Sequence, residues 1–77
     1  MSEVLEVLFG SRVRARLLRF FLQNPEAEYA LAEISNKNMI NKFQAKKELN
    51  DLKSIKFVVE RARGGKKFYG LNRDFPF

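Results

Sequence analysis

Apolar residues recur at helical spacing through the first part of the chain. Residues 3–9 place four of them on one side of a short helix, which Gly10 interrupts. Ser11 is a suitable N-cap for a second helix, which continues to about Asn24 and carries a broad apolar stripe. Asn24 precedes Pro25, and a residue before proline is pushed out of helical geometry. The pattern therefore predicts helices over residues 3–9 and 11–24.

Two shorter elements are predicted next. Glu28 and Tyr29 form a brief extended segment. Residues 30–37 are predicted to form a short helix with Leu31 and Ile34 facing inward. The sequence Asn-Lys-Asn at residues 36–38 is a polar break that suits a tight turn. We therefore expect the chain to reverse direction there.

A longer helix is predicted from an N-cap at Asn41 to about Ser54. Ala45, Leu49 and Leu52 repeat at i, i+4 and i+7, so this face is expected to dock on the core. The opposite side is polar apart from one aromatic residue. It carries Phe43, Lys47, Asn50 and Ser54, with Gln44 and Lys46 on its flanks.

The last part of the chain changes to a β pattern. Residues 57–59 begin one β-rich stretch and residues 67–71 form a second. Gly64 and Gly65 can supply the positive φ angles of a two-residue hairpin turn. Phe68 and Tyr69 are expected in the core, and stacking on single-stranded bases is the alternative.

Composition excludes several classes of function. The chain has 77 residues with 45% hydrophobic content, which fits one folded domain over residues 1–77. It lacks a signal-peptide pattern and any apolar run that could cross a bilayer, so we expect a cytoplasmic protein. Without Cys or His, no metal, thiol or imidazole chemistry is expected, and we predict neither a cofactor nor an enzyme. Glu48 and Asp51 are interpreted as ordinary surface charges.

Positive charge is concentrated in the second half of the chain. Residues 1–41 hold five bases and five acids, whereas residues 42–77 hold ten bases and four acids and carry the whole net charge of +6. Clustered positive charge attracts phosphate, so the basic helix and the basic hairpin favour a nucleic-acid partner. A solvated basic face without a partner is the alternative. The stripe formed by Arg12, Arg16 and Arg19 is interpreted as such a solvated face.

The order helix, short strand, helix, turn, helix and hairpin is that of a winged helix-turn-helix. We therefore predict a mainly α protein with a small β-hairpin (α+β), consisting of a three-helix core, a wing and a short N-terminal helix. Four segments within residues 8–72 resemble the small ArsR/MarR-like winged-helix transcriptional regulators of bacteria and archaea. They are Leu8–Ser11, Leu31–Ile34, Ala45–Leu52 and Phe68–Asn72. The chain departs from that family where Asn38 and Met39 replace the usual glycine of the turn, and where Asn41-Lys42 replaces serine-proline at the start of the next helix.

The resemblance implies that the helix at residues 41–54 enters the major groove of duplex DNA and that the hairpin lies on the backbone or in the minor groove. The candidate recognition-helix residues are Asn41, Lys42, Phe43, Gln44, Lys46, Lys47 and Asn50. The candidate wing residues are Arg61, Arg63, Gly64, Gly65, Lys66 and Lys67. Amides can pair with adenine, and lysines can bond guanine or neutralise phosphate.

Two questions stay open from the sequence. Phe43, on the outer face, can contact a thymine methyl group or a partner protein. A winged-helix protein-interaction module is therefore an alternative to a DNA-binding regulator. An RNA-binding winged helix is another, favoured if Tyr69 or Phe68 is exposed. A homodimer is expected because one small domain binds DNA weakly. Residues 4–9 and 75–77 are the candidate dimer surfaces, unless they pack on the chain's own core.

Overall fold

The computed structural model describes residues 12–75. Its elements are α2 (Arg12–Gln23), β1 (Glu28–Ala30), α3 (Leu31–Asn38), α4 (Lys42–Ser54), β2 (Val58–Arg63) and β3 (Lys66–Leu71). These bounds confirm the three helices, the short extended piece and the hairpin that the sequence predicts within this range. The helix predicted over residues 3–9 and the cap at Ser11 lie outside the described residues.

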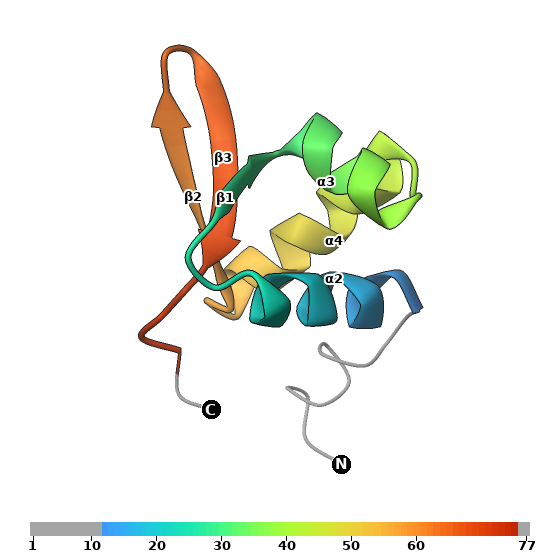
Figure 1. Ribbon diagram of the computed structural model, residues 1–77, viewed down its shortest axis with the longest axis horizontal. Coiled ribbons are helices and arrows are strands. Elements are labelled where there is room, and N and C mark those ends of the chain that lie inside the picture. Colours follow the sequence, from blue (N-terminus) through green and yellow to red (C-terminus); the bar gives the residue numbers. More distant parts are fainter. Residues whose placement is uncertain (1–11, 76–77) are drawn as a thin grey trace.

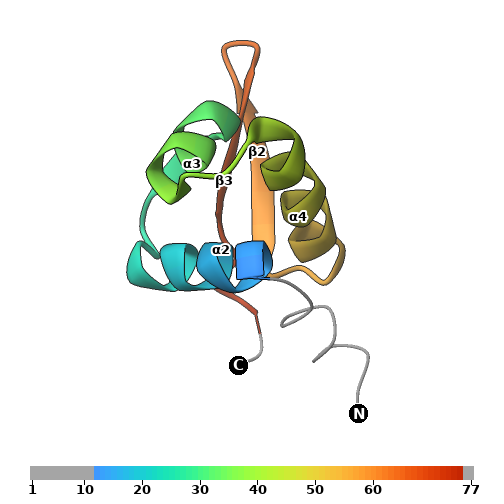
Figure 2. The ribbon, with the colours of Figure 1, turned by 90° about the vertical axis from the view of Figure 1, so that its right-hand side faces the viewer.

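The three strands form an antiparallel sheet in the order β1-β3-β2. The three helices all lie on one side of this sheet (Figure 1). The β2–β3 hairpin extends beyond the helices, and its tip lies at the end of the molecule opposite α2 (Figure 2). The hairpin therefore forms a wing beside α3 and α4.

The core fills the space between the helices and the sheet. Every helix, together with β2 and β3, contributes fully or almost fully buried apolar residues, each of which stabilises the fold by about 1.5–3 kcal/mol. They include Leu17, Phe21, Ile34, Leu49, Leu52, Val58 and Tyr69. Phe75 packs edge-on against Phe57, with ring centroids 5.2 Å apart. Of the two outcomes considered for the C-terminal segment, Phe75 therefore packs on the chain's own core.

The turn between α3 and α4 lies later than predicted. The polar break at residues 36–38 does not end the helix, since α3 continues through Asn38. The Asn38 side chain is buried and its Nδ2 donates a hydrogen bond to the Ile34 carbonyl over 2.9 Å, so it binds back to its own helix. Met39 instead adopts the left-handed conformation, with φ of 55°. Our placement of the turn at residues 36–38 was therefore wrong.

Candidate nucleic-acid interface

The outer face of α4 is formed by the residues that the sequence singles out. Asn41 caps the helix, because its Oδ1 accepts a hydrogen bond from the Gln44 backbone N–H over 2.7 Å. Ala45, Leu49 and Leu52 are fully buried on the opposite face. All seven candidate residues are exposed: Asn41, Lys42, Phe43, Gln44, Lys46, Lys47 and Asn50. The helix thus presents a continuous polar face with Phe43 within it.

The lysines on this face have no carboxylate partner in the part of the chain that the structure describes. No ion pair within residues 12–75 involves Lys42, Lys46 or Lys47. The two acids of the same helix are engaged elsewhere, because Arg14 of α2 holds both Glu48 and Asp51 at 2.6 Å. The outer face of α4 therefore keeps the full positive charge of its three lysines.

This ion-pair cluster corrects the interpretation of Glu48 and Asp51 as ordinary surface charges. Glu48 is only 5% exposed, and its carboxylate accepts a hydrogen bond from Nε of Arg14. A pattern in the sequence could have revealed this arrangement. Arg14 lies on the apolar stripe of α2 with Leu17, Leu18 and Phe21, at i, i+3, i+4 and i+7. Glu48 occupies the same kind of position on the buried face of α4.

A second arginine of α2, Arg16, contacts α3, the first helix of the helix-turn-helix. The Nη1 atom of Arg16 donates a hydrogen bond over 2.8 Å to the carbonyl of Asn38, at the C-terminus of α3. A cation there also interacts favourably with the helix dipole. Arg12, Arg16 and Arg19 are all exposed, as predicted, but Arg16 has this additional structural contact. Arg14 and Arg16 thus attach α2 to both helices of the helix-turn-helix.

The wing tip is built on its two glycines. Gly64 and Gly65 have φ angles of 54° and 79°, as a two-residue turn of the expected type requires. Neither glycine has an atom close enough to obstruct a side chain, so the need for glycine comes from the backbone conformation alone. The six candidate wing residues, Arg61, Arg63, Gly64, Gly65, Lys66 and Lys67, are all exposed.

The wing arginines lie on the sheet face that points away from the helices. Val58 and Tyr69 face the core, so by strand alternation Arg61 and Arg63 face outward. Both guanidinium groups form ion pairs with Glu28 of β1, and Nε of Arg61 lies 3.3 Å from its carboxylate. The Arg63 guanidinium also lies 5.2 Å from the centre of the Phe68 ring. These arginines are therefore partly neutralised.

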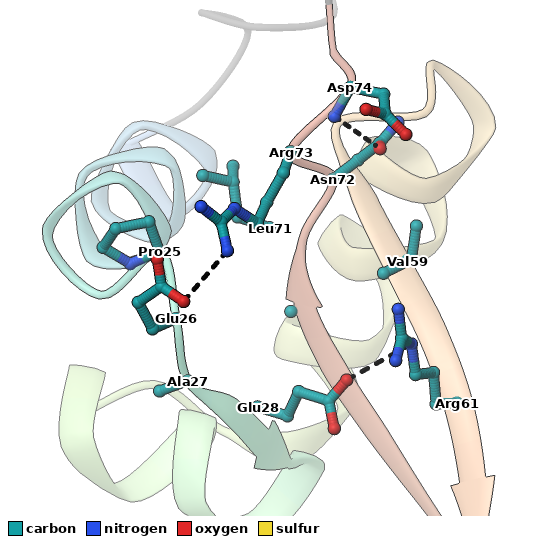
Figure 3. Close-up of a pocket in the computed structure, with 11 residues that line it drawn as sticks. Pro25, Glu26, Ala27, Glu28, Val59, Arg61, Leu71, Asn72, Arg73 and Asp74 are labelled. Atoms are coloured by element: carbon teal, nitrogen blue, oxygen red, sulfur yellow. Dashed lines mark hydrogen bonds and ion pairs between the residues drawn. The ribbon is translucent and has the colours of Figure 1, made fainter.

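Gly70 makes these ion pairs possible. Glu28 is separated from β2 by β3, and the residue that pairs with it on β3 is Gly70. A Cβ atom at Gly70 would lie 3.1 Å from Cγ of Glu28. Without that atom, the Glu28 side chain can cross β3 and reach the arginines of β2. Figure 3 shows Glu28 and Arg61 meeting in this way.

The same outer face has a hollow of about 370 Å³ next to these residues (Figure 3). Two ion pairs lie at this hollow, Glu28 with Arg61 and Glu26 with Arg73, the latter at 2.9 Å. Each guanidinium that lines the hollow therefore has a carboxylate partner. This arrangement leaves little charge for a ligand.

A groove of about 410 Å³ separates α4 from the wing, and here the two candidate sets meet. Lys46 and Asn50 line it from the helix, and Lys66 and Lys67 line it from the hairpin. Arg61 and Arg63 do not belong to this groove, because they lie on the other face of the sheet. The structure therefore brings Lys46 and Lys67 together at the groove and separates them from the arginines, whereas Lys66, the partner of Arg63 in the hairpin, lies at the tip between the two faces.

One carboxylate lies within this basic groove. Glu60 receives the Lys53 ammonium at 3.2 Å and has the Lys67 ammonium 4.0 Å away. The hydrogen bond from Lys53 holds the pKa of the Glu60 carboxyl below its ordinary value. Burial raises the pKa of the neighbouring Tyr69 hydroxyl. At neutral pH, Glu60 is charged and Tyr69 is neutral, so Glu60 offsets part of the lysine charge.

Two further observations concern the residues described. Between Arg12 and Phe75, His, Cys, Asp and Glu side chains form no group of three or more that could hold a metal ion. None of the helices in this range has both the length and the apolar character that a membrane span needs.

The arrangement of helices and wing defines the winged helix-turn-helix fold. No protein-family model and no curated protein matches the sequence. Solved structures match the fold with TM-scores of 0.75 for HlyU from Vibrio cholerae and 0.76 for NolR from Sinorhizobium fredii. Both are 18% identical to this chain over 92% of its length, which corresponds to 73% of HlyU and 67% of NolR.

A third structure is more similar in sequence. It is the homodimeric winged helix-turn-helix DNA-binding domain of a possible ArsR-family transcriptional regulator from Mycobacterium bovis. Its TM-score is 0.72 and its identity 25%, over 87% of this chain and 58% of that chain. The fold that the resemblance to ArsR-like regulators implied is thereby confirmed.

Proposed function

We propose that this chain is a transcriptional regulator that binds double-stranded DNA, with α4 in the major groove and the hairpin on the backbone or in the minor groove. The outer face of α4 carries the proposal. It presents three lysines outside any ion pair within residues 12–75, while the acids of the same helix pair with Arg14. A helix with such a face suits the phosphate-lined major groove.

The individual residue roles are part of this proposal. The exposed residues of α4 between Asn41 and Asn50 contact base edges and phosphates. Lys66 and Lys67, which share a groove with Lys46, continue the phosphate contacts onto the wing. Arg61 and Arg63 contribute less, because both share Glu28.

We further propose that residues 1–77 form one domain that works as a homodimer in the cytoplasm of a prokaryotic cell. The homodimeric state of the Mycobacterium bovis domain supports the dimer. Two copies would place two recognition helices about one turn of DNA apart and double the phosphate contacts. A single domain of this size makes too few contacts for tight binding at physiological salt.

One observation favours a second candidate function, a protein-interaction module. Phe43 is 87% exposed in the middle of the proposed DNA-binding face, and large exposed apolar side chains are common at protein interfaces. The RNA-binding alternative rested on Tyr69 or Phe68 as a platform for bases. Tyr69 is buried and cannot stack on bases, which weakens this alternative. Phe68, expected in the core, is instead half-buried on the outer face of the sheet beside Arg63.

Binding of the chain to random-sequence duplex DNA, followed by fluorescence anisotropy at several salt concentrations, tests the proposal. We expect the logarithm of affinity to fall linearly with the logarithm of salt concentration, with a slope of about −0.9 per phosphate contacted. The mass in solution, measured by light scattering, should be that of a dimer. Absence of binding at low salt would contradict the DNA-binding function, and tighter binding to single-stranded RNA would support the rival RNA function.

A further inference from the structure

Two large apolar side chains are exposed at the start of α4. Phe43, the second residue of the helix, and Met39, in the turn before it, are each 87% exposed. Leu22 of α2, at 50%, is the next most exposed large apolar residue within residues 12–75. Fold stability does not explain Phe43, because its side chain contributes almost no burial to the core.

The surroundings of Phe43 indicate what it contacts. Lys47 lies one helical turn further along the same face, and Lys42 and Lys46 lie on one flank of Phe43. Within residues 12–75 none of these lysines has a carboxylate partner. A matching surface must therefore be strongly negative and must also offer an apolar group at its centre.

The major groove of DNA combines these two properties. Its phosphates supply the negative charge, and the C5-methyl group of thymine is the apolar group that it exposes. The N-terminal residues of a recognition helix are those that approach base edges, and Phe43 lies in the first turn. Ala45 and Leu49 are buried on the opposite side of α4, so Phe43 points away from the core.

We propose that Phe43 selects thymine in the DNA site, by packing its ring on the C5-methyl group at the position that faces the first turn of α4. This inference rests on the proposed DNA-binding function and adds a base preference to it. Each half-site of the DNA then contains a thymine whose methyl group contributes to the affinity of the protein.

Deoxyuridine tests the proposal, because uracil pairs like thymine but lacks the methyl group. The probe is a duplex selected from a random pool by the wild-type chain, then synthesised with its thymines replaced one at a time by deoxyuridine. We expect one replacement in each half-site to weaken wild-type binding about fourfold, as the loss of one buried methyl group implies. Phe43→Ala should bind the thymine and uracil duplexes equally.

Leu22→Ala is the matched control, since it also removes an exposed apolar side chain but lies on α2. It should keep the wild-type sensitivity to deoxyuridine. If the wild-type chain binds the selected duplex and no replacement changes its affinity, the thymine contact is wrong although the DNA-binding function stands. A selected site without thymine would also overturn it. If the chain binds no DNA at low salt, the function itself fails, and Phe43 is better explained as a protein contact.

Discussion

The recognition helix and the wing both present cations to solvent, but their acids are arranged differently. In α4 both acids, Glu48 and Asp51, form ion pairs with Arg14 and none with the lysines of the outer face. In the hairpin, Arg61 and Arg63 share the carboxylate of Glu28, which crosses β3 to reach them. Counting basic residues would rate the two elements as similar. Because of the placement of their acids, we predict that α4 is the stronger site for phosphate.

Two arginines of α2 hold the helices of the helix-turn-helix in place. Arg14 forms ion pairs with α4, and Arg16 donates a hydrogen bond to the end of α3. Arg14 therefore has two effects: it fixes α4 on the core, and it offsets part of the negative charge of the two acids of that helix. Replacing Arg14 tests the first of these effects through the stability of the fold.

Replacing Arg14 should have the largest effect on stability. Arg14→Met leaves the buried carboxylate of Glu48 without its partner, and we expect the free energy of unfolding to fall by about 3 kcal/mol. The measurement is the urea midpoint, followed by circular dichroism. Arg14→Met combined with Glu48→Met should recover most of the loss, because an apolar pair can replace a buried ion pair.

Arg19→Met is the control on the same helix, since Arg19 is exposed. It should change stability by less than about 0.5 kcal/mol. If Arg14→Met were equally harmless, the ion-pair cluster would not be what fixes α4.

Releasing the wing arginines should have a smaller effect, which is a gain in DNA affinity and not a loss of stability. Glu28→Gln removes the carboxylate that Arg61 and Arg63 share, so we expect DNA affinity at low salt to rise, by up to about fivefold. The gain should shrink as salt is added.

Glu26→Gln is the matched control for this change. It adds the same charge to the molecule but releases Arg73, which lies in the other ion pair of the outer face (Figure 3). We expect a smaller gain from it. Equal gains would mean that binding responds to net charge alone, and the proposed neutralisation of the wing would be wrong.

Local patterns predicted most of the fold. The helical repeat of Ala45, Leu49 and Leu52 gave the buried face of α4, and Asn41 is the cap that its residue type suggests. Gly64 and Gly65 gave the turn of the wing. Each of these features depends on residues close together in the sequence, so each could be predicted from the local pattern.

The errors have local and non-local causes. Asn38 is a common turn residue, but its side chain bonds back to α3 and the exposed Met39 takes the left-handed conformation instead. Glu48 was interpreted as a surface charge although it occupies a buried helical position, because a charge on an apolar stripe needs a partner that lies elsewhere. That partner, Arg14, lies 34 residues away.

The sequence predicted which residues of the candidate site are exposed, but not how they are placed relative to one another. All thirteen named residues lie on the surface. The placement of Lys46 and Lys67 at one groove and of Arg61 and Arg63 on the outer sheet face depends on how α4 packs beside the hairpin and on the register of β2 and β3. Gly70, which lies between Glu28 and the arginines, leaves room for the Glu28 side chain, and no local pattern reports this. Whether these residues contact DNA stays a prediction.

The most direct test compares the salt dependence of DNA binding for two double variants that each lose two positive charges. Lys46→Ala with Lys47→Ala removes two lysines of α4 that have no ion-pair partner between Arg12 and Phe75, and Arg61→Ala with Arg63→Ala removes paired arginines of the wing. We predict that the helix variant loses about 1.8 from the salt slope, since each phosphate contact contributes about 0.9, and that the wing variant loses less than half as much. Equal losses in the two variants, or an unchanged slope in the helix variant, would contradict the account.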